Sequence, residues 1–282
     1  MTNIFPFLFV FFWSSAFVSG QIIVQSASPF ASLSFRFAIV AFGFLFFILI
    51  FKEKILVNKS LIFQSSITGI LFHGFYLGGV FFSYSIGLTA TVSALIVGLQ
   101  PVLTNILSGP ILKEKVTFIQ WIGILLGLTG TVLVIGIDIG NKIPSLGVLA
   151  SIIALFAATT ATIWQKKFTN NLSLSVNNFY QAIAASIFLF LTSFIFETPF
   201  IKFNTSFILS MSWQIIMVSF GAFTILMYLI KVGSASKTSN LFFLVPPTTA
   251  IMAWAVLNEE LYKIDIIGLF IAAIGVFIAT RK

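Results

Sequence analysis

The sequence predicts an all-α integral membrane protein with ten transmembrane helices, arranged as two five-helix inverted-topology repeats around a central cavity. Three observations support this fold class. Of the 282 residues, 59% are hydrophobic and only 8% are charged, whereas about 25% of a soluble domain is charged. The apolar runs last about twenty residues, the length that a helix needs to cross about 30 Å of hydrocarbon. Finally, a set of residues recurs at a constant offset along the chain.

Ten apolar segments provide the predicted helices. They cover residues 3–22, 30–51, 61–86, 90–112, 118–137, 146–164, 176–197, 208–230, 238–257 and 264–280. The first segment has no basic leader and no small-residue cleavage pattern, so we interpret it as a membrane helix and not as a signal peptide. The connections are short, and we expect a tight helical hairpin around Gly87-Leu88-Thr89.

The internal repeat divides the chain into halves, 1–137 and 146–282. An offset of 145 residues matches Pro101, Glu114, Gly123 and Gly130 with Pro246, Glu259, Gly268 and Gly275. Five helices per half is an odd number, so the halves should insert in opposite directions. We expect helix bends at Pro101, Pro246 and Pro247, because proline removes a backbone hydrogen bond. Interrupted helices at matching positions of two halves are typical of the binding site of a transporter.

The basic residues predict the orientation. With the N-terminus in the cytoplasm, eleven of the fifteen Lys and Arg residues fall on the cytoplasmic side, and Lys142, Lys202 and Lys263 fall on the other. This bias places both termini in the cytoplasm of a multi-pass plasma-membrane protein, which we interpret as the inner membrane of a bacterium. The formal net charge of +8 is therefore a topology signal, and we expect no nucleic-acid partner.

These motifs resemble the drug/metabolite transporter superfamily, specifically its EamA-type ten-helix transporters. The family pattern of a proline, a glutamate thirteen residues later and then glycines occurs at Pro101…Glu114 and again at Pro246…Glu259. The first helix adds Trp13-Ser14-Ser15-Ala16-Phe17, and the second adds Pro29 and Arg36. The resemblance covers essentially the whole chain. It implies ten helices around a central cavity and small-metabolite substrates, often exported amino acids.

The acidic residues narrow the substrate class. All seven lie at helix ends or in loops, so a cationic substrate would find no carboxylate in the cavity. We therefore expect a secondary transporter of small neutral or zwitterionic metabolites that works by alternating access, with amino acids and export favoured. The alternatives are neutral solutes such as sugars or nucleosides, and a lipid-carrier translocator.

Arg36 and the histidine stripe are the leading candidate substrate contacts. An intramembrane arginine costs about 3 kcal/mol, which makes it a functional candidate by default. Arg36 could hold a substrate carboxylate, or it could be structural and reach the outer interface. His73 and Tyr76 share one helix face with Ser83 and Tyr84. Their alternatives are substrate contact, proton transfer by His73, or hydrogen bonds to a neighbouring helix.

Further polar or aromatic residues complete the candidate binding set. Gln100 lies beside a repeated proline, and the others belong to the first, sixth, eighth and ninth helices: Trp13, Ser14, Thr159, Thr162, Tyr228, Asn240 and Trp254. For each of them the alternative is interhelical hydrogen bonding or packing. Gly123, Gly127, Gly130, Gly268 and Gly275 form small-residue faces that suit packing within the bundle, or dimerisation.

The composition argues against an enzyme. There is one histidine, no cysteine and no buried acid, so we expect neither a catalytic site nor a metal, and no cofactor. The expected partners are a small-molecule substrate and the lipid bilayer, with the protein a monomer or a weak homodimer.

Overall fold

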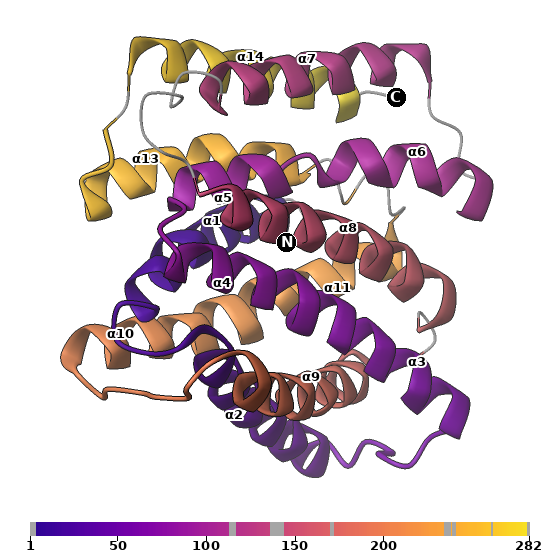
Figure 1. The fold of residues 1–282 in the computed structure, drawn as a ribbon. Coiled ribbons are helices and arrows are strands. Elements are labelled where there is room, and N and C mark those ends of the chain that lie inside the picture. Colours follow the sequence, from indigo (N-terminus) through magenta and orange to yellow (C-terminus); the bar gives the residue numbers. More distant parts are fainter. Residues whose placement is uncertain are drawn as a thin grey trace.

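The computed structural model describes residues 4–112, 117–135, 144–169, 172–233, 238, 241–260 and 262–280. In these residues, seven helical stretches are long and apolar enough to cross a membrane, and three shorter apolar helices complete a set of ten spans (Figure 1). The predicted all-helical, ten-span membrane fold is therefore confirmed.

The first five spans are built from seven α-helices and one π-helical stretch. In chain order they are α1 (Phe5–Ile23), α2 (Pro29–Ile50), a third span of α3 (Lys59–Gly69), η1 (Ile70–Leu77) and α4 (Gly78–Ser85), a fourth span of α5 (Ala90–Val97) and α6 (Gln100–Leu112), and α7 (Phe118–Ile135). The expected hairpin between the third and fourth spans is present. Gly87 lies there at a φ of 96°, a conformation that favours glycine.

The last five spans follow the same plan. They are α8 (Ser145–Phe168), α9 (Leu174–Phe196), an eighth span of α10 (Thr205–Trp213), η3 (Gln214–Ala222) and α11 (Phe223–Val232), a ninth span of η4 (Leu241–Leu244) and α13 (Val245–Leu257), and α14 (Lys263–Thr280). Side chains cap several of these helices. Ser173 accepts from the amide of Val176, and Asn204 from that of Phe207.

The repeated prolines lie where a span restarts. The fourth span breaks at Gly98 and Leu99, and Pro101 lies in the first turn of α6. In the ninth span the 3₁₀ turn η4 precedes α13, whose first turn contains Pro246 and Pro247. Proline is tolerated in the first turn, where its missing N–H would have no helical acceptor. Each repeat therefore contains a discontinuous span in place of one smoothly bent helix.

The third and eighth spans share a second irregularity. Their π-helical stretches begin at Ile70 and Gln214, almost at the offset of the sequence repeat. Such widened turns are rare and frequently occur at functional sites. Both stretches contribute residues to the cavity described below.

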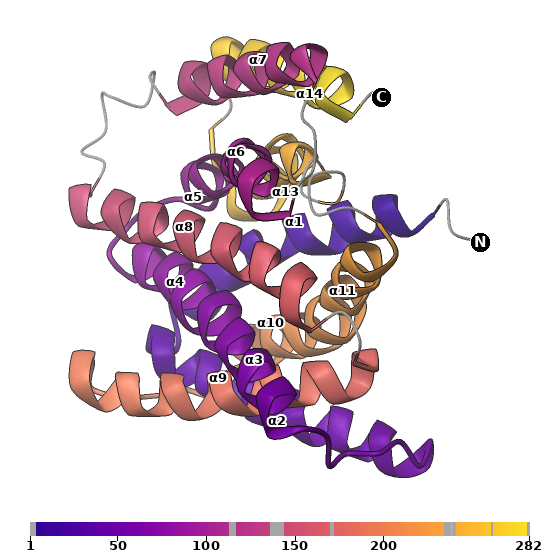
Figure 2. The same cartoon turned by 90° about the vertical axis from the view of Figure 1, so that its right-hand side faces the viewer.

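The helices α7 and α14 pack against each other in a layer beyond α13 and α6 (Figures 1 and 2). Their glycines allow this close contact. A Cβ on Gly123 would lie 2.3 Å from the backbone nitrogen of Ala279, and one on Gly130 would lie 2.4 Å from the carbonyl oxygen of Gly268. The small-residue faces are thus used inside the chain, as expected for packing within the bundle.

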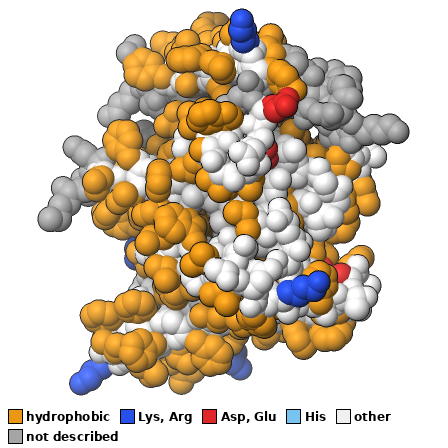
Figure 3. All heavy atoms as spheres, turned by 90° about the vertical axis from the view of Figure 1, so that its left-hand side faces the viewer, with side chains coloured by type: hydrophobic (Ala, Val, Ile, Leu, Met, Phe, Trp, Pro, Cys, Tyr) orange, Lys and Arg blue, Asp and Glu red, His pale blue; other side chains and the backbone are white. Residues whose placement is uncertain are grey.

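The surface is largely apolar, as a lipid-facing protein requires. Exposed large hydrophobic residues include Phe42, Phe63, Phe118, Leu209 and Phe270. Figure 3 views the end of the bundle that contains the α1–α2 and α13–α14 connections. On that face only isolated charged side chains appear among hydrophobic and uncharged ones.

Candidate functional site

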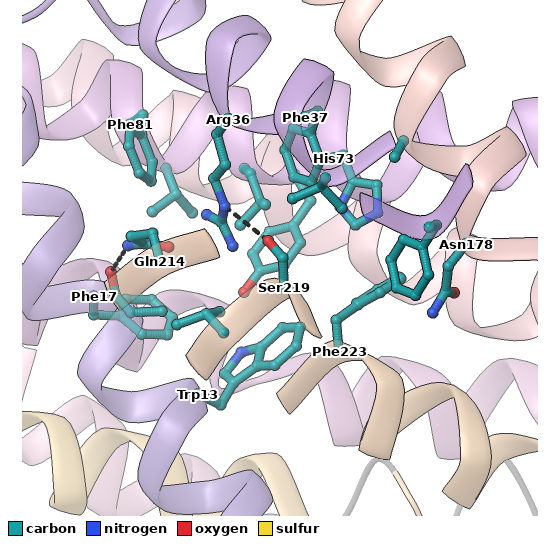
Figure 4. Close-up of a pocket in the computed structure, with 18 of the residues that line it drawn as sticks. Trp13, Phe17, Arg36, Phe37, His73, Phe81, Asn178, Gln214, Ser219 and Phe223 are labelled. Atoms are coloured by element: carbon teal, nitrogen blue, oxygen red, sulfur yellow. Dashed lines mark hydrogen bonds between the residues drawn. The ribbon is translucent and has the colours of Figure 1, made fainter. Parts of the chain in front are cut away.

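A buried cavity lies at the centre of the bundle, between residues of both repeats (Figure 4). Its lining comes from α1 (Trp13, Ala16, Phe17), α2 (Arg36, Phe37, Val40, Phe44), the third span (His73, Tyr76, Leu77, Val80, Phe81, Tyr84), α9 (Asn178, Ala182) and the eighth span (Gln214, Val218, Ser219, Phe223). The cavity volume is about 30 Å³. This space has room for a water molecule or two and is smaller than a metabolite.

Arg36 is the charged residue of the cavity. Its side chain is only 2% exposed, and Nε donates a 3.0 Å hydrogen bond to Oγ of Ser219 (Figure 4). Its guanidinium carbon also lies 5.1 Å from the centre of the Phe37 ring. In the part of the chain that the structure describes, no carboxylate lines the cavity. The guanidinium of Arg36 is therefore buried inside the bundle, where its positive charge would stabilise an anionic group of a ligand.

Aromatic rings surround the cavity. The Trp13 ring stacks on Tyr76 at a centroid distance of 6.4 Å and on Phe223 at 6.5 Å. The His73 ring lies 4.2 Å from Phe37 and 4.5 Å from Phe223, measured between centroids. These contacts fix the rings in the cavity wall, where they offer flat apolar surface to a ligand.

Several buried polar atoms of the lining have no hydrogen-bond partner among the described residues. They are Nδ1 of His73, the hydroxyl of Tyr84, Oδ1 of Asn178 and Oε1 of Gln214. The amide of Gln214 is held in place, because Nε2 donates to the carbonyl of Ala16 at 2.8 Å and to Oγ of Ser19 at 3.0 Å. An unsatisfied buried polar group costs about 1–3 kcal/mol. A solute that supplies donors would remove this cost.

The structure brings together four of the residues selected from the sequence: Trp13, Arg36, His73 and Tyr76 all line the cavity. Three others lie at contacts between helices. Ser14 donates to the carbonyl of Val245 at 3.3 Å, and Gln100 donates to Oγ1 of Thr162 at 2.9 Å. A substrate contact by these three residues stays a prediction.

The remaining candidates lie elsewhere. The Thr159 hydroxyl donates within its own helix to Leu155, and Tyr228 packs edge-on against Phe5. Trp254 is 57% exposed and lines an apolar groove between α13 and α14, together with Pro247. Asn240 lies outside the described residues. Thr159, Tyr228 and Trp254 are not among the described residues that line the cavity.

Sequence reasoning missed Asn178, Gln214 and Ser219. The signal that could have found two of them is the repeat itself. The polar stripe of the third span contains His73, and an offset of 145 residues leads to Val218, beside Ser219. Polar residues within the long apolar stretch 205–232 of the second repeat would then have been candidates, and this stretch contains Gln214 and Ser219.

Hydrogen bonds join the two repeats at both ends of the bundle. At one end, Ala27 and Ile201 form an isolated antiparallel bridge, and Glu259 accepts from the Ala90 amide at 3.2 Å and from the Thr91 hydroxyl. At the other end, the Ser173 hydroxyl donates to Glu53 at 2.6 Å. These contacts have to rearrange if either end is to open.

The fold and the cavity define a polytopic helical membrane protein with an internal repeat and a largely apolar central cavity that contains a buried arginine. A family model described as the EamA-like transporter family matches residues 1–136 and 145–281. The chain therefore belongs to the EamA-like transporter family, within the drug/metabolite transporter superfamily. This membership confirms the resemblance and identifies the protein as a membrane transporter and not as an enzyme.

Two relatives that match nearly the whole chain are also named as transporters. The chain is 29% identical over 286 residues to an uncharacterized transporter, YyaM, of Bacillus subtilis, covering 96% of this chain and 91% of that one. It is 25% identical to an uncharacterized transporter of Archaeoglobus fulgidus, covering 98% of this chain and 97% of that one. A crystal structure of a protein that is 17% identical superposes with a TM-score of 0.78, covering 99% of this chain and 96% of that chain. This last similarity concerns the fold alone.

Proposed function

We propose that this transporter moves zwitterionic metabolites, amino acids above all, through the central cavity by alternating access. The observation that carries the proposal is Arg36, a buried cation in the cavity with no carboxylate among the described residues of the lining. A substrate carboxylate would complete this site, because the planar guanidinium suits a carboxylate and only Nε is engaged by Ser219.

The ammonium group of the substrate would use acceptors of the same lining. Oε1 of Gln214 and Oδ1 of Asn178 are buried acceptors with no partner among the described residues. Both are neutral, so they would accept from an ammonium without attracting a bare cation as strongly as a carboxylate does. This combination favours a zwitterion over a permanent cation.

The aromatic walls favour a substrate with an apolar body. Trp13, Phe37 and Phe223 form a continuous ring cluster next to Arg36 and His73. Apolar surface buried there contributes roughly 25 cal/mol per Å². Amino acids with apolar or aromatic side chains therefore fit the lining better than strongly hydrated sugars.

Transport requires the cavity to open alternately toward the two sides. The 30 Å³ cavity is too small for an amino acid, so binding must widen it. The two repeats would move relative to each other around the midplane site, as in other inverted-repeat carriers. Both termini would be cytoplasmic, as the distribution of basic residues indicates, and export would be the physiological direction.

A thermal-shift screen of the full-length protein in detergent tests this function. A ligand present at a hundred times its Kd stabilises its target by about 2.7 kcal/mol. We expect stabilisation by apolar amino acids, lost in Arg36→Gln and kept in Lys202→Gln, which removes one positive charge outside the cavity. Stabilisation only by sugars or nucleosides, unaffected by Arg36→Gln, would replace this proposal with that of a neutral-solute transporter.

A further inference from the structure

A second groove lies between α6 and α8, away from the central cavity. Its walls are Leu107 and Ile111 of α6 with Thr160, Ile163, Trp164, Lys167 and Phe168 of α8, and its volume is about 350 Å³. The two helices are joined by the bond from Gln100 to Thr162, and their C-terminal ends diverge toward the right of Figure 1. The groove lies between these diverging ends.

The groove has the polarity of an amphiphile. Most of its walls are apolar, and two of its apolar residues are openly exposed: Ile111 is 41% exposed and Phe168 is 37% exposed. Thr160 and Lys167 of the lining are exposed as well. In a membrane protein this surface faces lipid. Lys167 is the charged residue of the lining, and it lies in the last turn of α8. An apolar trough that ends in a single cation is complementary to an acyl chain attached to an anionic headgroup.

The two adjacent lysines are used differently. The ammonium of Lys166 donates to the carbonyl of Ile230 at 3.0 Å and to that of Gly233 at 2.5 Å. The ammonium of Lys167 lies 5.3 Å from the centre of the Phe168 ring and makes no hydrogen bond or ion pair with the described residues. Lys166 therefore supports the helix packing, whereas the charge of Lys167 is available to a ligand at the mouth of the groove.

Trp164 provides a second sign of a missing partner. Its indole Nε1 is buried and has no acceptor among the described residues, and its ring packs against Phe168 at a centroid distance of 4.7 Å. An ester carbonyl or phosphate oxygen of a lipid would supply that acceptor once the indole turned toward the groove.

We propose that the α6–α8 groove is a binding site for an anionic phospholipid. One acyl chain lies along Leu107, Ile111 and Ile163, and the headgroup phosphate meets Lys167. Basic pockets between membrane helices on the cytoplasmic side are typical of anionic-lipid recognition, and the distribution of basic residues places this end of α8 on the cytoplasmic side. The proposal is independent of the substrate of the central cavity.

Native mass spectrometry of the delipidated full-length protein tests the site. The protein would be titrated with phosphatidylglycerol and with phosphatidylethanolamine that carries the same acyl chains, and the affinity of the first bound lipid would be measured. We expect phosphatidylglycerol to bind more tightly. Lys167→Gln should weaken its binding about fivefold, the value of one lysine near an anionic headgroup, and bring it to the level of phosphatidylethanolamine.

Two further variants separate this groove from general attraction to lysines. Lys59→Gln removes an exposed lysine at the same end of the bundle and should leave the first binding step unchanged. Leu107→Trp fills the apolar trough and should weaken the binding of both lipids. Equal affinity of the wild type for the two lipids, equal effects of Lys167→Gln and Lys59→Gln, or full competition by glycerol phosphate alone would each overturn the proposal.

Discussion

Gly98 and Pro246 contact each other across the two repeats, so the break in the fourth span packs on the restart of the ninth. A Cβ built on Gly98 would lie 2.5 Å from Cγ of Pro246. No side chain fits at Gly98 without movement of the proline ring. The two discontinuous spans therefore meet at their irregular points, beside α1, where Ser14 contacts Val245.

This contact predicts that Gly98→Ala destabilises the protein. The added methyl group must displace Pro246 or α5, and overpacking of this kind costs about 1–3 kcal/mol. We expect a lower apparent unfolding temperature in detergent. Gly221→Ala is the matched control, since its Cβ would meet nothing closer than 3.6 Å. Equal unfolding temperatures for the two variants would show that the contact is not tight.

A second prediction concerns the layer formed by α7 and α14. Gly130→Ala would place a methyl group 2.4 Å from the Gly268 carbonyl oxygen and force the helices apart. Since van der Waals packing drives association of helices in membranes, we expect a clear loss of thermal stability. Thr129→Ala, on the exposed side of the same helix, should have little effect. A change of oligomeric state without a loss of stability would instead assign the glycine face to dimerisation.

A third prediction concerns the effect of Glu197, which lies away from the cavity, on the stability of the protein. Ser28 precedes α2 but its side chain does not cap the helix, and Glu197 of the other repeat accepts from the amides of Ala31 at 2.8 Å and Phe30 at 3.2 Å. A carboxylate at a helix N-terminus is stabilising through these bonds and the helix dipole.

We therefore expect Glu197→Gln to lower stability by about 1 kcal/mol, measured as a lower apparent unfolding temperature. The control is Glu260→Gln. The hydrogen bond that Glu260 accepts comes from the Tyr262 hydroxyl two residues away and does not join the two repeats. If the two variants unfold alike, the cap between the repeats contributes nothing.

We expect Ser219 to strengthen substrate binding by holding the Arg36 side chain in position. Ser219→Ala removes the acceptor that holds Nε of Arg36, so the guanidinium loses its orientation while its charge remains. Loss of such a bond costs about 1.5 kcal/mol, which corresponds to roughly tenfold weaker binding of an amino acid. Radioligand binding measures this change. Ser85→Ala, at an exposed position of α4, is the control, and equal affinities for both variants would exclude a positioning role for Ser219.

Much of the architecture could be predicted from the sequence. The span lengths follow from the thickness of the hydrocarbon layer. The repeat follows from prolines and glycines that match at a constant offset along the chain. Arg36 and His73 were found because a polar group in an apolar helix must face the bundle interior. The helix restarts at Pro101 and Pro246 were expected only as bends, since a sequence does not show whether the preceding turn stays helical.

The rest of the site depended on packing that no periodicity reveals. Trp254 and Pro247 share a helix face, but a seven-residue spacing does not say whether that face points inward. The structure turns it toward the groove at α14. Gln100 and Gln214 each donate from the amide nitrogen to a neighbouring helix, and the amide oxygen of each is buried with no partner among the described residues. Of the two, Gln214 is the one among the described residues that line the cavity. Which of two similar side chains faces the cavity depends on contacts between helices distant in sequence.

The most direct test of the account measures whether Arg36 recognises a carboxylate. Binding of the best-stabilising amino acid and of its carboxamide analogue would be compared by calorimetry, in the wild type and in Arg36→Gln. We predict that the wild type binds the amino acid at least about tenfold more tightly, and that Arg36→Gln loses this preference. Equal binding of the two compounds by the wild type, or an unchanged preference in Arg36→Gln, would contradict the account.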